Sequence, residues 1–205
     1  MNTVHSSRPH RESQREAALT AARGILEAEG LAALTARRLA GVLGCSVGTL
    51  YNLFDSFDAL VVQLNLATLA ELELALAAAA LPGASAEEAA QSLAAAYLAH
   101  TTRHRRRWAA VLEANAAPRS GQPDAMRDST ARLVELVEQA LAPIFPPEAA
   151  PGTARLAAAV LWTGLEGIAA LSTAGNLALV APGADASSMA RLLVRAYVTG
   201  LATRD

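Results

Sequence analysis

Lysine is absent from this chain, since all 17 of its basic residues are arginine. This absence excludes the phosphate-binding loop that depends on a lysine, and it excludes Schiff-base chemistry. The only cysteine is Cys45, so an internal disulfide is impossible and a reducing compartment is expected. Aromatic residues make up 4% of the chain, which is too few for the core of a typical β-sandwich or barrel.

Signals for export or for a membrane span are also missing. Residues 1–15 are polar and lack the apolar stretch of a signal peptide. Residues 167–184 form the longest charge-free run near the C-terminus, but Pro182 and Gly183 would break a spanning helix. We therefore expect a soluble, cytoplasmic protein that makes no membrane contact.

Alanine and leucine are abundant. Hydrophobic residues account for 53% of the 205 residues, and most of them are these two strong helix formers. The formal net charge is −2, so the chain as a whole is not a basic nucleic-acid binder. The composition predicts an all-α protein with a sizeable core.

Three short helices are expected in the first quarter of the chain. Ser13 and Glu16 have the spacing of a capping box, and they predict a first helix that ends at Gly30. Capping residues then predict a helix over residues 35–44 and another over residues 46–54. Two short helices joined by a tight turn with a glycine are typical of a helix-turn-helix.

Longer helices are expected in the rest of the chain, separated by proline and glycine pairs and by a loop over residues 115–124. Ser85 and Glu88 form a second capping box. The helical period and the breaks predict helices over residues 57–80, 85–103, 125–145, 153–174 and 186–203, with a shorter element around Trp108.

The segment from Thr35 to Phe54 reads TARRLAGVLGCSVGTLYNLF and resembles the helix-turn-helix of the TetR/AcrR family of transcriptional regulators. Ten positions match the family pattern in register: Thr35, Leu39, Ala40, Gly44, Ser46, Gly48, Thr49, Leu50, Tyr51 and Phe54. The resemblance implies an N-terminal three-helix bundle with the helix-turn-helix and a larger C-terminal helical domain for ligand binding and dimerisation. It divides the chain into a flexible arm (1–12), a DNA-binding domain (13–56) and a ligand-binding and dimerisation domain (57–205).

A recognition helix that starts at Ser46 would enter the major groove of DNA. Val47 and Asn52 are the candidates for contact with base edges, and the hydroxyl and arginine side chains nearby are candidates for phosphate contact. The expected DNA-binding residues are Thr35, Arg37, Ser46, Val47, Gly48, Thr49, Tyr51 and Asn52.

Two features of this region depart from the family pattern. Phe57 stands where the family often has a lysine, which removes one phosphate contact. Residues 1–60 carry six arginines and six acidic residues, so the DNA-binding domain is neutral and a shallow salt dependence is expected. Arg8, Arg11 and two histidines of the arm are available to compensate.

Large side chains among the many alanines of the C-terminal domain are either ordinary core or the lining of an effector pocket. The expected ligand-binding residues are Tyr97, His100, His104, Trp108, Leu112, Met126, Trp162 and Glu166. His100 and His104 have a metal-binding spacing, but a third ligand is missing, so neither a metal nor a cofactor is expected.

The last two helices are expected to form a homodimer. Gly164 and Gly167 permit close helix approach, and residues 189–201 carry an apolar stripe with little chain left to cover it. The partners expected are a pseudo-palindromic operator in double-stranded DNA, a small-molecule effector and a second copy of the chain.

The function expected is that of a ligand-responsive repressor released from its operator by a small molecule. The alternative is a helical ligand-binding or interaction protein whose helix-turn-helix no longer binds DNA, which the neutral charge and Phe57 favour. Residues 44–48 match the G-x-S-x-G pattern of hydrolases, but a helix rather than a strand is expected before Ser46, so an enzyme is not expected.

Overall fold

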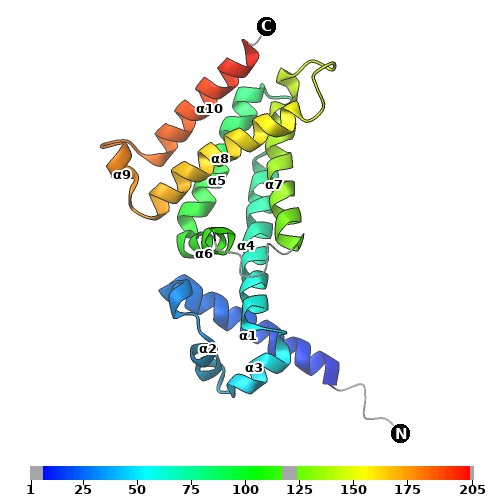
Figure 1. The fold of residues 1–205 in the computed structure, drawn as a ribbon, viewed down its shortest axis with the longest axis vertical. Coiled ribbons are helices and arrows are strands. Elements are labelled where there is room, and N and C mark those ends of the chain that lie inside the picture. The colour runs from blue at the N-terminus through cyan, green and yellow to red at the C-terminus, as the bar shows by residue number, and fades with distance from the viewer. Residues whose placement is uncertain (1–6, 117–123, 204–205) are drawn as a thin grey trace. The chain divides into compact units, whose positions relative to one another are not determined.

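The computed structural model describes residues 7–116 and 124–203, which are helical with no β-strand among them (Figure 1). The all-α prediction is confirmed. The α-helices are α1 (Ser7–Glu29), α2 (Ala36–Leu43), α3 (Val47–Leu53), α4 (Phe57–Ala79), α5 (Ala86–Arg103), α6 (Arg105–Ala116), α7 (Asp124–Leu141), α8 (Thr153–Thr173), α9 (Leu177–Val180) and α10 (Ala186–Ala202). Two 3₁₀ turns, Leu31–Ala33 and Ala142–Ile144, follow α1 and α7.

The chain forms two compact units. One, which we call the head, comprises residues 1–68 and 106–120; the other, the body, comprises residues 69–105 and 121–205. The head is therefore larger than the DNA-binding domain expected over residues 13–56, because it takes in the first half of α4 and also α6.

The head has a core of its own. Leu39 and Ala40 of α2 and Leu50 of α3 are buried. They pack in one cluster with apolar residues of α1 and with Leu60 and Leu64 of α4. Ala110 of α6 belongs to the same cluster, which explains why α6 is part of the head.

Capping residues fix the helix-turn-helix as the sequence predicts. The Thr35 side chain accepts a hydrogen bond from the backbone N–H of Arg38, and the Ser46 side chain accepts one from Thr49. Gly44 closes α2 with a φ of 65°, in the left-handed region that favours glycine. The turn between α2 and α3 is thus held by local backbone chemistry.

The predicted start of the first helix is wrong. α1 begins at Ser7 and runs through Ser13, so Ser13 and Glu16 lie inside the helix and form no capping box. Pro9 does not prevent this because it lies in the first turn, where its missing N–H would have no partner. Residues 7–12 of the expected arm are helical, and residues 1–6 lie outside the described residues.

The body is a bundle in which α5 packs against α7, α8 and α10, while α8 packs against α7 and α10. Leu133, Leu161 and Val194 are among its fully buried side chains. Gly164 of α8 allows the close approach that we expected, because a Cβ there would lie 2.8 Å from Cδ2 of Leu193 in α10. The sequence did not predict α9.

Two helices, Phe57–Ala79 and Thr153–Thr173, are long and apolar enough to cross a membrane, although the sequence predicted no membrane span. Length and composition alone are weak indications, because core helices of water-soluble proteins have the same properties. Both helices bury apolar faces within the protein, including Leu72 and Leu76 in α4 and Leu161 and Leu165 in α8.

Candidate nucleic-acid interface and effector cavity

The recognition helix α3 presents polar side chains on its uncovered face. Its buried face is formed by Leu50 and Leu53, while Tyr51 is 53% exposed and Val47 is 36% exposed. All of the expected DNA-binding residues are exposed except Thr49, which is half-buried. The structure thus brings the two predicted base-reading residues and their neighbours to an accessible surface.

Capping limits what the hydroxyl groups of this surface can offer to DNA. The Ser46 oxygen lies 3.1 Å from the Thr49 backbone nitrogen and 2.9 Å from the Thr49 hydroxyl. One of these two hydroxyls donates to the other, so the pair keeps one O–H for a phosphate. Ser46 is the N-cap of a helix, which is not the strand-to-helix elbow that a hydrolase nucleophile needs.

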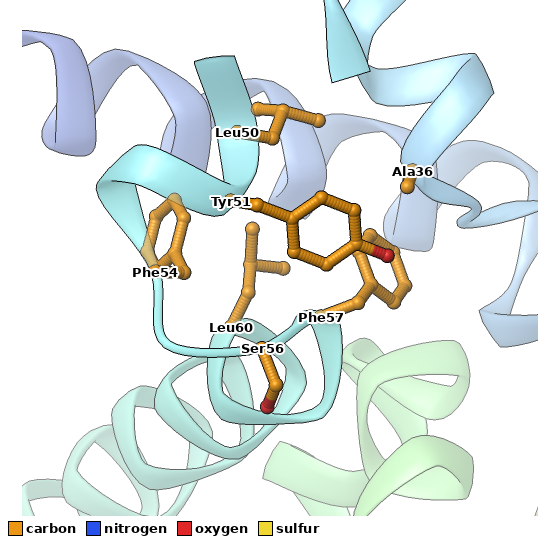
Figure 2. A pocket seen from close by; sticks show the side chains of 7 residues that line it. All are labelled: Ala36, Leu50, Tyr51, Phe54, Ser56, Phe57 and Leu60. Atoms are coloured by element: carbon orange, nitrogen blue, oxygen red, sulfur yellow. The ribbon is translucent and has the colours of Figure 1, made fainter. Parts of the chain in front are cut away.

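Phe57 lines a small apolar cleft beside the recognition helix. Figure 2 shows its ring in the same cleft as Tyr51, with Ser56 at the start of α4. The lining residues are Ala36, Leu50, Tyr51, Phe54, Ser56, Phe57 and Leu60. Phe57 therefore packs against the core of the head instead of supplying the positive charge that the family pattern often has here.

Most arginines of the head bind other parts of the head. Arg38 pairs with Glu29 at 2.8 Å. Arg37 is exposed and makes neither a hydrogen bond nor an ion pair with any residue that the structure describes. Arg37 is therefore the guanidinium of the helix-turn-helix that is available for a phosphate.

Two arginines of α1 bind the C-terminal end of α3. Arg11 Nη2 donates to the backbone carbonyl of Asn52 at 2.7 Å, and Arg15 Nη1 donates to the carbonyl of Leu53 at 2.8 Å. The Arg15 guanidinium also lies 4.8 Å from the centre of the Phe54 ring. Arg11, expected in a flexible arm that reaches DNA, is thus part of a helix and bonded to the recognition helix.

Two arginines of α6 bind the C-terminal end of α1. Arg106 Nη1 donates to the backbone carbonyls of Glu27, at 2.9 Å, and of Ala28. Arg107 is only 4% exposed; it donates to the Thr68 hydroxyl at 3.2 Å and pairs with the Glu27 carboxylate at 3.3 Å. The start of α6 is therefore joined to both α1 and α4.

The body contains an apolar cavity between α4, α5, α7 and α8. Its lining residues are Leu76, Ala90, Leu93, Tyr97, Val137, Leu161, Trp162 and Leu165. The ring centroids of Tyr97 and Trp162 lie 5.1 Å apart, in an edge-to-face arrangement. The cavity volume is about 10 Å³, which is room for a single water molecule.

The structure brings two of the eight expected ligand-binding residues, Tyr97 and Trp162, into the lining of this cavity. Glu166 lies one turn from Trp162 on α8 and is half-buried. Burial raises the pKa of its carboxyl above the usual value, and a hydrogen bond with the Trp162 side chain opposes this shift.

The other five expected residues do not line the cavity. His100 and His104 lie at the end of α5, with ring centroids 4.8 Å apart. No group of three metal-ligating side chains occurs within residues 7–116 and 124–203. Met126 is buried in α7. Trp108 and Leu112 belong to α6 in the head, and Trp108 is 2% exposed.

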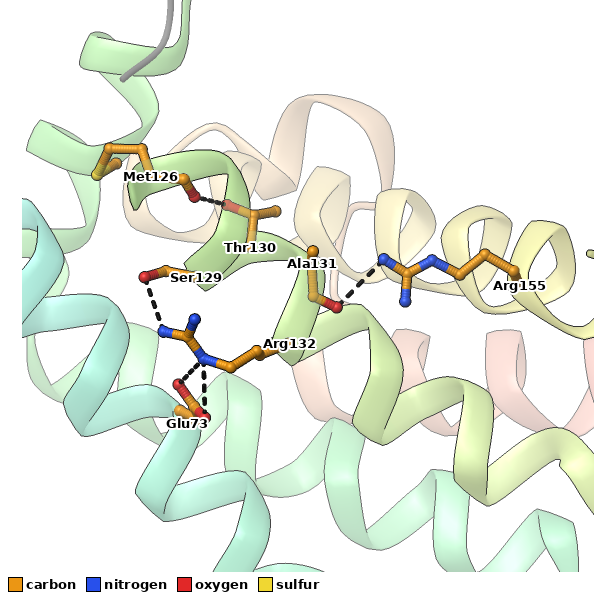
Figure 3. A network of polar contacts seen from close by, with 7 residues as sticks. All are labelled: Glu73, Met126, Ser129, Thr130, Ala131, Arg132 and Arg155. Atoms are coloured by element: carbon orange, nitrogen blue, oxygen red, sulfur yellow. Dashed lines mark hydrogen bonds and ion pairs between the residues drawn. The ribbon is translucent and has the colours of Figure 1, made fainter. Parts of the chain in front are cut away.

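Arginine side chains join α7 to α4 and to α8 at the surface of the body. Figure 3 shows Arg132 of α7 between Glu73 of α4 and the Ser129 hydroxyl. The Arg132 Nε lies 3.0 Å from a carboxylate oxygen of Glu73. Arg155 of α8 donates to the Ala131 carbonyl, also of α7, at 3.2 Å. These contacts join the helices around the cavity at their surface.

Large apolar side chains are exposed on both α8 and α10. Leu156 of α8 and Leu192 of α10 are each 68% exposed, and Val160 is 48% exposed. The buried face of α10 is formed by Ala190, Val194 and Val198. The stripe predicted for a partner comprises Met189, Leu192, Leu193, Ala196, Tyr197, Gly200 and Leu201, and all seven are exposed or half-buried.

The raised pKa of Glu166 gives a prediction about stability. Glu166→Gln should raise the melting temperature at pH 8, because the native state must otherwise bury part of a charge there. The gain should shrink as the pH falls through the native pKa towards the unfolded value, since the native carboxyl is then neutral. Thermal melts of both proteins between pH 8 and pH 4 measure the difference; an equal gain at every pH would contradict the assignment.

Comparison with known proteins gives the family. Residues 90–197, more than half of the chain, match the family model described as "Tetracyclin repressor-like, C-terminal domain". No curated protein matches the chain.

Solved structures share the fold. A protein of unknown function from Rhodococcus sp. RHA1 is 26% identical, with a TM-score of 0.73 over 92% of this chain and 95% of that one. A TetR-like transcriptional regulator from the same organism is 23% identical, with a TM-score of 0.63 over 95% and 97%. The multidrug binding protein EbrR, complexed with imidazole, is 25% identical, with a TM-score of 0.57 over 90% and 94%. The family model and the helix-turn-helix together show that this chain belongs to the TetR family of transcriptional regulators.

Proposed function

We propose that the protein is a homodimeric repressor that a small, uncharged, apolar molecule releases from its operator. The observation that carries the DNA-binding part is the exposed polar face of a recognition helix that is capped at Ser46 and packed on a core of its own. Val47 would meet a thymine methyl group, and Asn52 would hydrogen-bond a base edge. Arg37, Tyr51 and the hydroxyls of Thr35 and the Ser46–Thr49 pair would contact phosphates.

The exposed apolar surface of α8 and α10 supports a homodimer. Leu156, Val160 and Leu192 are large apolar side chains left in water, whereas Leu193 and Tyr197 of the α10 stripe contact α8 within the chain. Gly167 of α8 is exposed, and a Cβ at this position would meet no atom within 4 Å. A second copy packed here would form a two-fold interface, so that two heads face consecutive major grooves.

The lining of the body cavity supports an uncharged apolar effector. Every lining side chain is aliphatic or aromatic, so a charged group would lose its hydration without an ion-pair partner in the lining. Small-molecule sites have volumes of roughly 300–1,000 Å³. The cavity must therefore open to admit an effector, and the closed conformation described here is the one that an effector would disfavour.

Two helices connect the cavity to the head through the chain itself. α4 is continuous and contributes Leu76 to the cavity and Thr68 to the contact with Arg107. α5 contributes Tyr97 and is followed directly by α6, whose arginines bind α1. We infer that opening the cavity shifts these helices and changes the spacing of the two heads.

A helical binding protein without DNA affinity is the second candidate. The observation that favours it is that Arg11, Arg15 and Arg38 are bonded within the head, which lowers the positive charge available for DNA.

A gel-shift titration separates the two candidates. The parent protein should shift the DNA upstream of its own gene. Tyr51→Ala should weaken this binding by about tenfold or more, because it removes both the hydroxyl that contacts a phosphate and the ring that holds this hydroxyl in place. Tyr51→Phe, the matched control, removes only the hydroxyl and should weaken binding by roughly fivefold. A folded dimer with no shift on this DNA or on a genomic fragment library would favour the second candidate.

The salt dependence of binding tests the role of Arg37. Arg37→Gln should reduce the slope of log K against log salt by about 2 for a dimer, since one phosphate contact per protomer is lost. Arg38→Gln, its neighbour that pairs with Glu29, should change the slope less. Titrations at four salt concentrations measure both slopes, and equal changes for the two variants would contradict the assignment.

Three small compounds that share one benzene ring but differ in charge test whether the effector is uncharged. Toluene should raise the melting temperature and release the operator, whereas benzoate and benzylammonium should do neither, because the cavity lining offers no counter-charge. Ala90→Val narrows the cavity and should suppress the toluene response while the operator shift persists. Release of the operator by benzoate or benzylammonium at the same concentration would contradict the proposal that the effector is uncharged.

A further inference from the structure

The recognition helix has an unusual need for support at its C-terminal end. α3 has only seven residues, which is far too short for a helix to be stable without tertiary contacts. Its last turn contains no basic side chain to interact with the carbonyls that lack partners within the helix. Ser46 caps the N-terminal end and Leu50 packs in the core, so the carbonyls of the C-terminal end are the part of α3 that still needs partners.

Arg15 binds that end with two kinds of contact. Its guanidinium donates to the Leu53 carbonyl at 2.8 Å and lies 4.8 Å from the centre of the Phe54 ring. Arg15 is half-buried, and a charge-assisted hydrogen bond is stronger in such surroundings than in water. Leu53 and Phe54 are buried, so Arg15 joins α1 to the point where α3 enters the core.

Arg11 binds the neighbouring carbonyl. It lies four residues before Arg15, so the two side chains share one face of α1. Its Nη2 lies 2.7 Å from the carbonyl oxygen of Asn52, the residue whose side chain faces a base edge in the proposed function. The two arginines thus hold two consecutive carbonyls at the end of the recognition helix.

We propose that Arg11 and Arg15 are positioning residues that hold the recognition helix in the orientation that reads DNA. This inference rests on the proposed function, because its first test measures DNA binding. It goes beyond that function because the two arginines bind backbone carbonyls of the protein and not phosphates of the DNA. Both guanidinium groups compensate the negative end of the α3 dipole and keep Asn52 and Tyr51 at fixed positions. A role in phosphate contact would instead make them equivalent to Arg37.

Salt dependence separates positioning from phosphate contact. Loss of a phosphate contact weakens specific and nonspecific binding alike and lowers the salt slope. Loss of a positioning contact weakens specific binding, because the base-reading side chains shift, while the number of neutralised phosphates stays the same. The two roles therefore predict different outcomes for nonspecific affinity and for the salt slope.

Three variants in the full chain test the proposal: Arg11→Gln, Arg15→Gln and Arg15→Lys, with Arg37→Gln as the matched charge-loss control. Arg15→Gln should weaken binding to the DNA that the parent shifts by about tenfold, with nonspecific affinity and salt slope close to those of the parent. Arg11→Gln should act in the same direction, and Arg15→Lys, which keeps a charged donor near Phe54, should recover part of the loss. Arg37→Gln should lower both affinities and the slope.

Amide hydrogen exchange gives a readout that does not need DNA. In Arg11→Gln and Arg15→Gln the amides of α3 should exchange about tenfold faster than in the parent, while those of α8 in the body stay unchanged. If the parent binds no DNA, the proposed function fails while this readout still tests the positioning role. Unchanged exchange in α3 would overturn the proposal, and so would a salt slope that falls as it does in Arg37→Gln.

Discussion

Hydrogen bonds from arginine side chains to carbonyls at helix C-termini link the helices of the head around its apolar core. The last carbonyls of a helix have no partner within it and form the negative end of its dipole. Neither α1 nor α3 has a basic residue in its own last turn. Arginines from other helices take that place: Arg11 and Arg15 of α1 bind α3, and Arg106 of α6 binds α1. Three helices distant in the sequence are thereby linked in series.

This use of arginine limits the charge that the head can offer to DNA. With no lysine in the chain, every positive side chain is an arginine, and the head commits several of them to its own carbonyls and carboxylates. Phe57 adds apolar contact instead of charge. We expect the affinity of such a head for DNA to depend less on counterion release and more on the fit of α3 in the groove, because base contacts do not weaken with salt as phosphate contacts do. The orientation of α3 then matters more than in a strongly basic head.

The sequence predicted the features that are decided within a few residues of each other. Thr35, Gly44 and Ser46 act as predicted because a cap or a left-handed turn needs only its immediate neighbours. The roles of Arg11 and Arg106 depend on partners 41 and 79 residues away, and no local pattern encodes such contacts. Trp108 was a candidate for the effector pocket because, in the sequence, a large side chain among alanines looks the same whether it lines a pocket or fills a core. Only the packing of α6 on the head assigns its position.

Of the helices that line the cavity, α4 also contributes to the core of the head, and α5 leads directly into α6 of the head. A ligand shifts a conformational equilibrium only by its different affinity for the two states. A closed cavity of about 10 Å³ has almost no affinity for a ring-sized molecule, so nearly all the binding energy belongs to an opened body. The opening that we propose would move Leu76 or Tyr97, which lie on α4 and on α5, the helix that leads directly into α6. Arg106 and Arg107 join the start of α6 to α1, and Arg15 of α1 joins α1 to the end of α3, so hydrogen bonds and an ion pair connect α6 to the recognition helix within the head.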